Sequence, residues 1–434
     1  MAGRRWGGEA GRVEIDGFTA PGWEGVADAF AANFACRGEV GAAVCVYQAG
    51  RAVVDLAAGV ADQVTGRAYT RHTIQPFMSV SKGVVAIAAN MLADSGTLDL
   101  DVPVARYWPE FTQAGKEAIP VRWLLTHQAG LAALDRPLSR EGLLSWTPVI
   151  KALEEQRPNW TPGTAHGYHS LTYGFLLGEL IRRVTGQPPG AWIGEHISGP
   201  LGAECYLGLP ARLHGAVAPV LPFPPAPEGQ ATTLRLEPGS LPYRAALGAV
   251  SPPLGPLSVN DPRIQAAQIP AANGIGDARG LARIFAAVIG EVGGLRLLSE
   301  AAMESARRER VRGPDLAAAA MAGSALGLGF NLPTRDRPLG GPGSFGTVGL
   351  GGCRAWALPE AGLAFAYLPI QLLDVNPTRA SSRWPPPLAK GPGCPWPRSE
   401  VCARGRQILT RGLRAAGRST GAAGFPYYGD VGQG

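Results

Sequence analysis

The fold-determining stretch is Phe77-Met78-Ser79-Val80-Ser81-Lys82-Gly83-Val84-Val85-Ala86-Ile87-Ala88-Ala89-Asn90-Met91-Leu92. From Ser79 to Leu92 its apolar residues recur every three or four positions, which predicts a helix, and Gly96 follows as a stop signal. The segment is apolar nearly all round. We therefore expect this helix to be buried at the centre of the molecule.

Strand signals lie on both sides of this helix. Towards the N-terminus, a short helix at 23–34 precedes residues 41–48 and 52–60, which are typical of two strands in a hairpin. Towards the C-terminus, short apolar segments separated by Gly or Pro predict strands at 328–332, 344–349, 353–358 and 363–368. Because a two-stranded hairpin alone is marginally stable, we expect one sheet built from both ends of the chain.

The middle of the chain is expected to be mainly helical. Helices are predicted at 121–126, 173–185 and 277–289, while the Pro-rich residues 206–262 indicate long loops. The predicted fold class is α+β, an α/β sandwich in which an antiparallel sheet is flanked by helices and interrupted by a large all-helical insertion.

The predicted boundaries follow from these changes of pattern. They are a flexible N-terminus at 1–12, a main domain at 13–370 with sheet segments at about 13–75 and 325–370 around an insertion at about 76–324, and a Pro/Gly/Arg-rich tail at 371–434 with a possible helix at 400–416. The tail is atypical because its prolines prevent an ordinary sheet or helix over much of its length.

A nucleophile is suggested at the start of the central helix. Residues at i and i+3 share a helix face, so Ser79 and Lys82 can meet, and a helix N-terminus favours negative charge at the serine. Burial lowers a lysine pKa, so a neutral Lys82 can accept the serine proton. Chance also produces Ser-x-x-Lys about once in a chain this long. Two features of this Ser-x-x-Lys favour a catalytic role. It is the only such pattern in the chain, and it contains one of the four lysines.

Two other segments can complete an acyl-transfer site. Tyr168-His169-Ser170 lies just before the helix at 173–185, and a nearby lysine ammonium would favour the phenolate of Tyr168 as a general base. Gly346-Thr347-Val348-Gly349-Leu350-Gly351-Gly352 follows the late strands, and a backbone N–H there can form an oxyanion hole with that of Ser79. Each segment also has a structural explanation. Tyr168 can serve only in packing, and the Gly-rich segment can be a bulged hairpin.

Metal and cofactor motifs are weak or absent. His166 and His169 have His-x-x-His spacing but no third cluster of ligands, and His127 is better explained as a structural residue at a helix end. The six cysteines are too few and too scattered for a disulfide framework, which indicates a reducing compartment. Phosphate-loop, dinucleotide, Gly-x-Ser-x-Gly and His-Glu-x-x-His motifs are also missing.

Together these segments resemble the serine beta-lactamase and penicillin-binding-protein superfamily, and within it the class C beta-lactamase-like esterases. The resemblance runs from about Gly22 to Leu368. Its motifs are Phe77 to Gly83, Gly96-Thr97-Leu98-Asp99-Leu100-Asp101-Val102-Pro103-Val104, Tyr107-Trp108-Pro109-Glu110-Phe111, Leu124-Leu125-Thr126-His127-Gln128-Ala129-Gly130-Leu131, Trp160-Thr161-Pro162-Gly163, Tyr168-His169-Ser170, Ala272-Asn273-Gly274 and Gly349 to Gly352. The family's fold, a sheet from both termini with a helical insertion, agrees with the pattern above.

The resemblance implies a serine hydrolase that works through an acyl-enzyme. It makes Ser79 the nucleophile, Lys82 its proton acceptor and Tyr168 the base, with the backbone of Leu350 beside Gly349 as the second oxyanion donor. It implies no metal and no organic cofactor, and a small-molecule ester or acyl compound as the substrate. Water as the acceptor gives hydrolysis, whereas an alcohol or amine gives acyl transfer.

Two departures from the family pattern bear on the substrate. Ser170 stands where beta-lactamases usually carry Asn, and Thr347 stands where they carry Lys. Loss of the cation removes the usual partner of a substrate carboxylate, so a carboxylesterase acting on small neutral esters ranks above a beta-lactamase. The alternatives are an acyltransferase or transesterase of secondary metabolism, a weak beta-lactamase, and a non-catalytic binding or scaffold member. Thr347 and the atypical tail are the features that support the non-catalytic alternative.

Charge and hydropathy narrow the partners and the location. The chain has a net charge of +6, and residues 371–434 contain nine basic and three acidic residues, so the rest has a net charge of zero. The basic charge therefore gives no evidence for a nucleic-acid-binding surface on the main domain, and no nucleic-acid partner is expected. The sequence contains no run of about 18 apolar residues, the length that a membrane-spanning helix needs. The N-terminus lacks a secretory signal, so a cytoplasmic location is expected. The sequence leaves the oligomeric state open.

Overall fold

The computed structural model describes residues 13–224, 236–318, 321 and 323–372. Its centre is helix α2 (Ser81–Asp94), which continues a single 3-10 turn, η1 (Met78–Val80). Eleven of the fourteen residues of α2 are buried, and Gly96 follows with φ of 77°. The predicted central helix is confirmed. Both the predicted N-terminal tail, 1–12, and the C-terminal segment 373–434, with its possible helix at 400–416, lie outside the described residues.

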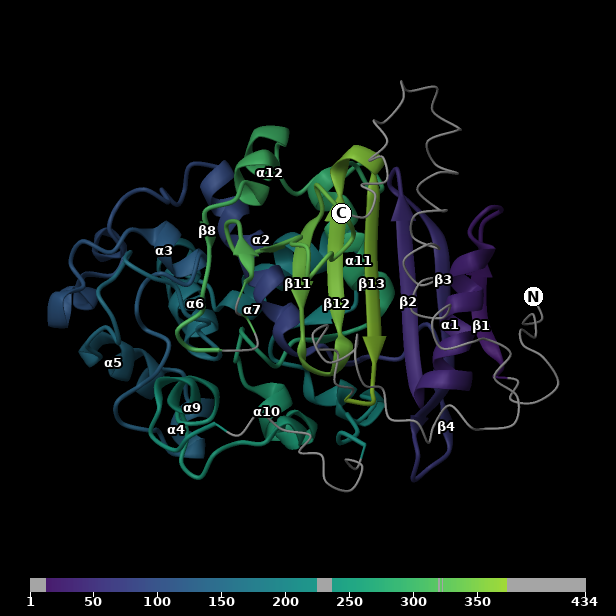
Figure 1. The fold of residues 1–434 in the computed structure, drawn as a ribbon, viewed down its shortest axis with the longest axis horizontal. Coiled ribbons are helices and arrows are strands. Elements are labelled where there is room, and N and C mark those ends of the chain that lie inside the picture. The colour runs from purple at the N-terminus through teal and green to yellow at the C-terminus, as the bar shows by residue number, and fades with distance from the viewer. Residues whose placement is uncertain (1–12, 225–235, 319–320, 322, 373–434) are drawn as a thin grey trace, which may run out of the picture.

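One large antiparallel sheet is built from both ends of the described chain. Its strands are β1 (Ile15–Thr19), β2 (Gly41–Gln48), β3 (Arg51–Asp62), β4 (Arg67–Ala68), β8 (Val311–Arg312), β9 (Ala325–Leu326), β10 (Asn331–Leu332), β11 (Phe345–Val348), β12 (Arg354–Leu358) and β13 (Leu363–Pro369). The order is β1-β3-β2-β13-β12-β11-β10-β9-β8, with β4 paired to β3. Figure 1 shows this order from β1 on the right to β8 on the left.

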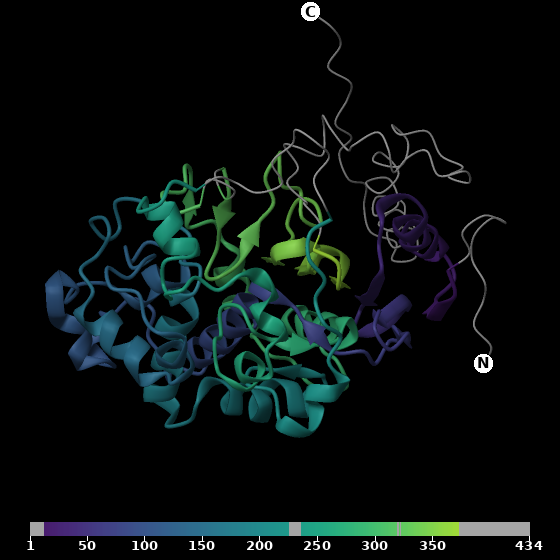
Figure 2. The same cartoon turned by 90° about the horizontal axis from the view of Figure 1, so that it is seen from below.

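The two halves of the sheet meet where β2 pairs with β13, with Cys45 opposite Ala366. Alternation along β2 creates two cores, because Ala43 and Cys45 face the main core while Val44 and Val46 face a second core. Helix α11 (Ala278–Ile289) packs on the first face, and α1 (Glu24–Arg37) packs on the other. The layered arrangement of helices and sheet is also seen from below in Figure 2.

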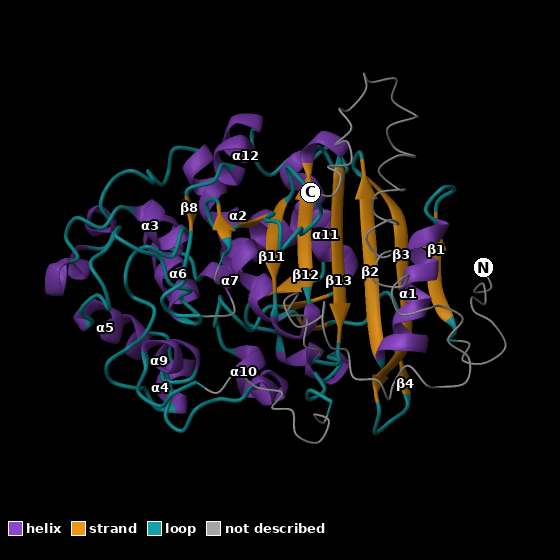
Figure 3. Ribbon diagram, in the orientation of Figure 1, coloured by secondary structure: helices purple, strands orange, loops and turns teal. Residues whose placement is uncertain are grey.

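The region between the two sheet segments is dominated by helices and loops (Figure 3). Its remaining helices are η2 (Val104–Arg106), η3 (Pro109–Gly115), α3 (Val121–Leu125), α4 (Arg140–Leu144), α5 (Thr147–Glu155), α6 (Thr172–Thr185), α7 (Pro189–Ile193), η4 (Gly194–Ser198), α8 (Gly199–Leu201), η5 (Ala211–Ala216), α9 (Leu241–Ala246), η6 (Pro256–Asn260), α10 (Pro262–Ala266) and α12 (Glu300–Arg307). The short 3-10 helices η8 (Leu350–Gly352) and η9 (Pro359–Ala361) lie between the last strands. The α+β fold class is therefore confirmed.

Some details differ from the predicted pattern. A small second sheet, β5-β7-β6, joins Gln75–Pro76, Ile275–Gly276 and Cys205–Tyr206. Strand β8 joins the main sheet although it precedes the predicted return of strands at 325. The insertion is thus mainly helical but also contributes short strands. No helix among the described residues combines the length and the apolar character needed to cross a bilayer.

Candidate active site

The Ser79 turn is held in a strained conformation by a neighbouring segment. Met78 has φ of 52°, a left-handed value that is uncommon for residues with a side chain and is often found at functional sites. Phe77 N–H donates to the carbonyl of Gly274 at 2.9 Å, and Gly274 N–H donates to Ser81 Oγ at 2.9 Å. These bonds fix the turn at the start of α2 and leave Ser79 partly exposed.

Lys82 lies beside Ser79, as the i, i+3 spacing predicts. Its Nζ is 3.2 Å from Ser79 Oγ and donates to the carbonyl of Ala271 at 2.9 Å. The residue is 4 % exposed. Burial lowers the pKa of the Lys82 ammonium to about 7. Near neutral pH, a substantial share of the protein therefore carries a neutral amine next to the serine.

Tyr168 completes the group around Ser79. Its ring centroid is 4.6 Å from Lys82 Nζ. Burial raises the pKa of Tyr168 to about 12, although a hydrogen bond with Ser79 opposes this shift. The expectation that Lys82 favours the phenolate is therefore wrong for the resting site. Desolvation disfavours both charged forms, so the resting site pairs a neutral phenol with a lysine whose neutral and protonated forms are both populated near pH 7.

Asp315 holds the backbone of Tyr168 in place. Both carboxylate oxygens accept the N–H of Tyr168 at 3.0 Å, and Oδ1 also accepts those of Ala317 and Ala318 at 2.9 and 2.7 Å. Leu316 N–H donates to the carbonyl of His166 on the same loop at 3.1 Å. The segment before β9 is thereby tied to the turn that presents the Tyr168 ring.

The predicted third motif begins on β11 and reaches the Ser79 turn. A Cβ added at Gly349 would lie 2.9 Å from the carbonyl oxygen of Phe77 and 3.2 Å from Met78 Cβ, so only glycine fits this approach without a shift. Leu350 follows in η8, with its side chain exposed. Within the described residues, the N–H groups of Ser79 and Leu350 donate to no carbonyl, as an oxyanion hole requires.

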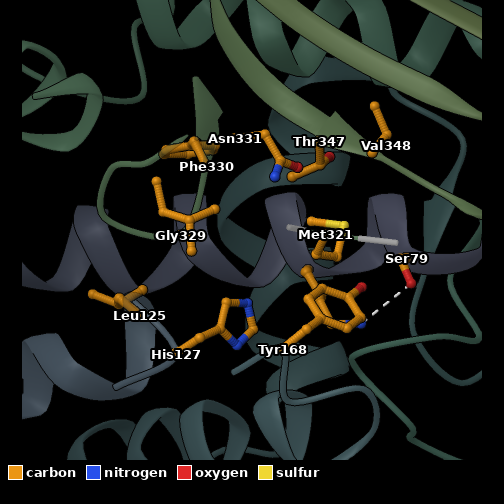
Figure 4. Close-up of a pocket in the computed structure, with 12 residues that line it drawn as sticks. Ser79, Leu125, His127, Tyr168, Met321, Gly329, Phe330, Asn331, Thr347 and Val348 are labelled. Atoms are coloured by element: carbon orange, nitrogen blue, oxygen red, sulfur yellow. Dashed lines mark hydrogen bonds between the residues drawn. The ribbon is translucent and has the colours of Figure 1, made fainter. Parts of the chain in front are cut away.

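A narrow cavity of about 30 Å³ opens beside the serine and lysine (Figure 4). It is lined by Ser79, Lys82, Leu125, His127, Tyr168, Met321, Leu326, Gly329, Phe330, Asn331, Thr347 and Val348. The structure thus brings together Ser79, Lys82, Tyr168 and Thr347 from three distant segments. Ser170, which the sequence also indicated, is not among the described residues that line the cavity.

The histidines form a neutral network behind the site. His127 Nδ1 accepts the N–H of His169 at 3.1 Å, while His169 Nε2 accepts the N–H of Leu131 at 2.9 Å and its Nδ1 donates to the carbonyl of Gly167 at 2.6 Å. Burial lowers the pKa of His169 to about 4 and that of His127 well below its usual range. With both nitrogens occupied, His169 is unsuited to bind a metal. His127 has a structural role, as predicted, yet its ring also lines the cavity.

Sequence reasoning missed two polar residues of the site. Asn331 lines the cavity from β10, and Asp315 supports Tyr168 from a loop 147 residues later. Neither residue stands in a recognisable motif. A Gly-Pro-Asp turn at 313–315 is the only local signal near Asp315.

Comparisons with known proteins agree with this geometry. The family model "Beta-lactamase" matches residues 26–372. The esterase/beta-lactamase LipL of Mycobacterium tuberculosis is 34% identical over 384 residues, which cover 85% of each chain. A crystal structure of a family VIII carboxylesterase has a TM-score of 0.77 and 33% identity, and covers 92% of this chain and 99% of that one. A penicillin-binding-protein homologue from Caulobacter crescentus has a TM-score of 0.75 and 32% identity, and covers 84% and 95% of the two chains. The chain described here belongs to the beta-lactamase family.

Proposed function

We propose that this protein is a serine carboxylesterase that hydrolyses small neutral esters through an acyl-enzyme at Ser79. Its relatives identify it as a serine hydrolase. The observation that carries the assignment of residues is the 3.2 Å contact between Ser79 Oγ and a buried Lys82. A lysine with a pKa of about 7 can accept the serine proton at neutral pH.

In the acylation step, Ser79 loses its proton to Lys82 Nζ while Oγ bonds to the ester carbonyl carbon. The N–H groups of Ser79 and Leu350 stabilise the oxyanion that forms. The neutral phenol of Tyr168 then protonates the leaving alkoxide as the carbon–oxygen bond breaks, and Lys82 returns a proton to Tyr168. The high pKa of Tyr168 suits this acid role, because the resting phenol holds its proton.

In the deacylation step, water attacks the same carbonyl from the side on which the alcohol departed. The proton of water passes to the Tyr168 and Lys82 pair, and Ser79 Oγ leaves with a proton. By microscopic reversibility, the residues that protonated the alcohol deprotonate the water. The products are a carboxylic acid and free enzyme.

The cavity supports an ester over a charged beta-lactam as the substrate. Of the described residues that line it, Lys82 alone carries a charge, and Thr347 stands where a beta-lactamase has a cation for the substrate carboxylate. The names of the relatives support both activities, since LipL is called an esterase and a beta-lactamase, whereas the structural neighbour is called a carboxylesterase.

Labelling with a fluorophosphonate, followed by intact mass measurement, tests the nucleophile. We expect one adduct on the wild type and none on Ser79→Ala. An unlabelled wild type would instead support a non-catalytic family member. Turnover of p-nitrophenyl butyrate should exceed turnover of nitrocefin, and the reverse order would contradict the ester assignment.

We also propose a cytoplasmic location. The buried free thiols Cys45, Cys205 and Cys353 are compatible with a reducing compartment, whereas the disulfide bond of Cys36 argues against one. Fractionation of the native host, with detection by an antibody against this chain, distinguishes cytoplasmic from exported protein.

A further inference from the structure

An unpartnered hydroxyl lies in the wall of the catalytic cavity. Thr347 is 4 % exposed, and its Oγ1 has no hydrogen-bond partner. A buried hydroxyl without a partner is costly, and most such groups in native proteins are hydrogen-bonded. Because Thr347 lines the cavity beside Ser79, a bound molecule can supply the missing partner.

The carboxamide of Asn331 belongs to the lining of the same cavity. Asn331 on β10 pairs with Gly346 on β11, the residue before Thr347, so Asn331 and Thr347 belong to neighbouring strands. Both residues line the cavity, and Figure 4 labels them among the residues around it. The Asn331 carboxamide makes no hydrogen bond to another described residue. Together the two side chains offer donors and acceptors without any charge.

Apolar side chains make up part of the remaining lining. Leu125, Leu326, Phe330 and Met321 also line the cavity. At about 30 Å³, the cavity holds only a small group, roughly the space of one water molecule. A carboxylate placed there would lose its hydration and find no arginine or second lysine among the lining residues.

We propose that Thr347 and Asn331 form a specificity subsite for an uncharged hydrogen-bonding group, such as a hydroxyl, on a short acyl chain of the ester substrate. This proposal rests on the esterase function proposed above. It names esters of short hydroxy acids as the preferred substrate class over esters of the corresponding alkyl acids. The preference arises because only the hydroxy ester satisfies the buried hydroxyl of Thr347.

Two isosteric esters test the subsite. Each enantiomer of p-nitrophenyl 3-hydroxybutanoate differs from p-nitrophenyl 3-methylbutanoate only in having a hydroxyl where the latter has a methyl group. We expect kcat/KM of the wild type to favour one hydroxy enantiomer by about 2- to 10-fold, the typical effect of one neutral hydrogen bond. Thr347→Val replaces the hydroxyl by a methyl group of similar size, and it should bring the ratio to about one or below.

A second variant and a control make the result specific. Asn331→Leu changes the other side of the subsite and should also reduce the ratio. Thr334→Val removes another buried threonine hydroxyl without a partner, which lies outside the cavity, and should keep the wild-type ratio. A wild-type preference for the methyl ester, or an unchanged ratio in both cavity variants, would overturn the subsite. Failure of Ser79 to react with a fluorophosphonate would instead overturn the esterase function itself.

Discussion

The ionisation of Lys82 should control the activity of this enzyme. Its folded-state pKa is about 7, below the usual value of 10.5, and the neutral form is the one that accepts the Ser79 proton. We therefore expect kcat/KM to rise with pH, about tenfold per unit well below pH 7, and to level off above that value. Measurement in a pH-stat avoids the titration of a nitrophenol product.

Lys82→Arg is the matched control for this profile. Arginine cannot lose its proton in a protein, so the variant lacks a proton acceptor at every accessible pH. We expect kcat/KM to fall by about 10²- to 10⁴-fold, the typical contribution of general base catalysis. An unchanged acid limb in a still active variant would assign the titration to another group.

Local spacing explains which site residues were predictable. Ser79 and Lys82 are three residues apart on one helical stretch, so sequence alone places them together. Asn331 and Asp315 reach the site only through strand pairing and loop packing, which leave no local pattern. The protonation state of Tyr168 was mispredicted for a related reason, because desolvation depends on how completely distant segments enclose the ring.

At the level of elements, the loop that contains Asp315 should position the turn of Tyr168. Asp315→Ala removes the acceptor of three backbone N–H groups and should lower kcat about 10-fold or more, with a smaller change in KM. Asp315→Asn keeps an oxygen in the Oδ1 position and should recover most of kcat. Steady-state kinetics beside thermal unfolding separate the effects. A lower Tm with wild-type kcat in Asp315→Ala would show a purely structural role.

The contact between α2 and β11 depends on the absence of a side chain at Gly83. An added Cβ would lie 2.7 Å from Thr347 Oγ1 and 2.9 Å from its Cγ2. Alanine favours helix by about 1 kcal/mol over glycine, but overpacking typically costs about 1–3 kcal/mol. We expect Gly83→Ala to lower the free energy of unfolding, as measured by urea denaturation.

Two further variants check this interpretation of Gly83. Gly194 lies in the helical segment η4 with nothing within 4 Å of an added Cβ, so Gly194→Ala should be neutral or stabilising. Adding Thr347→Ala to Gly83→Ala removes both close atoms and should recover part of the loss. Equal destabilisation by both glycine replacements would rule out the contact with β11 as the cause.

Helices and strands whose apolar residues recur at a regular spacing were predicted, and those without such a spacing were not. The pattern of Val80, Val84 and Ile87 identified the central helix, and β11, β12 and β13 lie within one or two residues of their predicted limits. Helices α4, α5 and α12 are five to nine residues long and were missed, because a short amphipathic turn carries little periodic signal. Strand β1 was also missed, since it contains Gly17 with φ of 126° and only one of its five residues, Ile15, is buried.

At the scale of the whole molecule, one sheet joins distant parts of the chain around the site. The pairing of β2 with β13 closes the sheet, and α11 covers it beside α2. The sequence indicated this closure, because the two-stranded N-terminal hairpin would be only marginally stable alone. The short strands β8, β9 and β10 pair over only two positions each, which is too short a stretch for an alternating pattern to show in the sequence.

Charge is also unevenly distributed along the chain. Residues 373–434 contain nine basic and three acidic residues, so a chain that ends at Leu372 has a net charge of zero instead of +6. Every strand of the described sheet, and the residues Ser79, Lys82 and Tyr168, precede that point. We expect the shortened chain to lose its retention on a cation exchanger at pH 7, because the positive field that binds the resin is confined to the removed segment. Its kcat/KM for a neutral ester should stay within about twofold of the full chain, because the net charge of an enzyme does not steer an uncharged substrate. Both quantities are measured on the full and the shortened chain. If the shortened chain still binds the exchanger, the catalytic domain has a basic surface of its own. If it loses most of its kcat/KM while its thermal unfolding is unchanged, the removed segment contributes to catalysis.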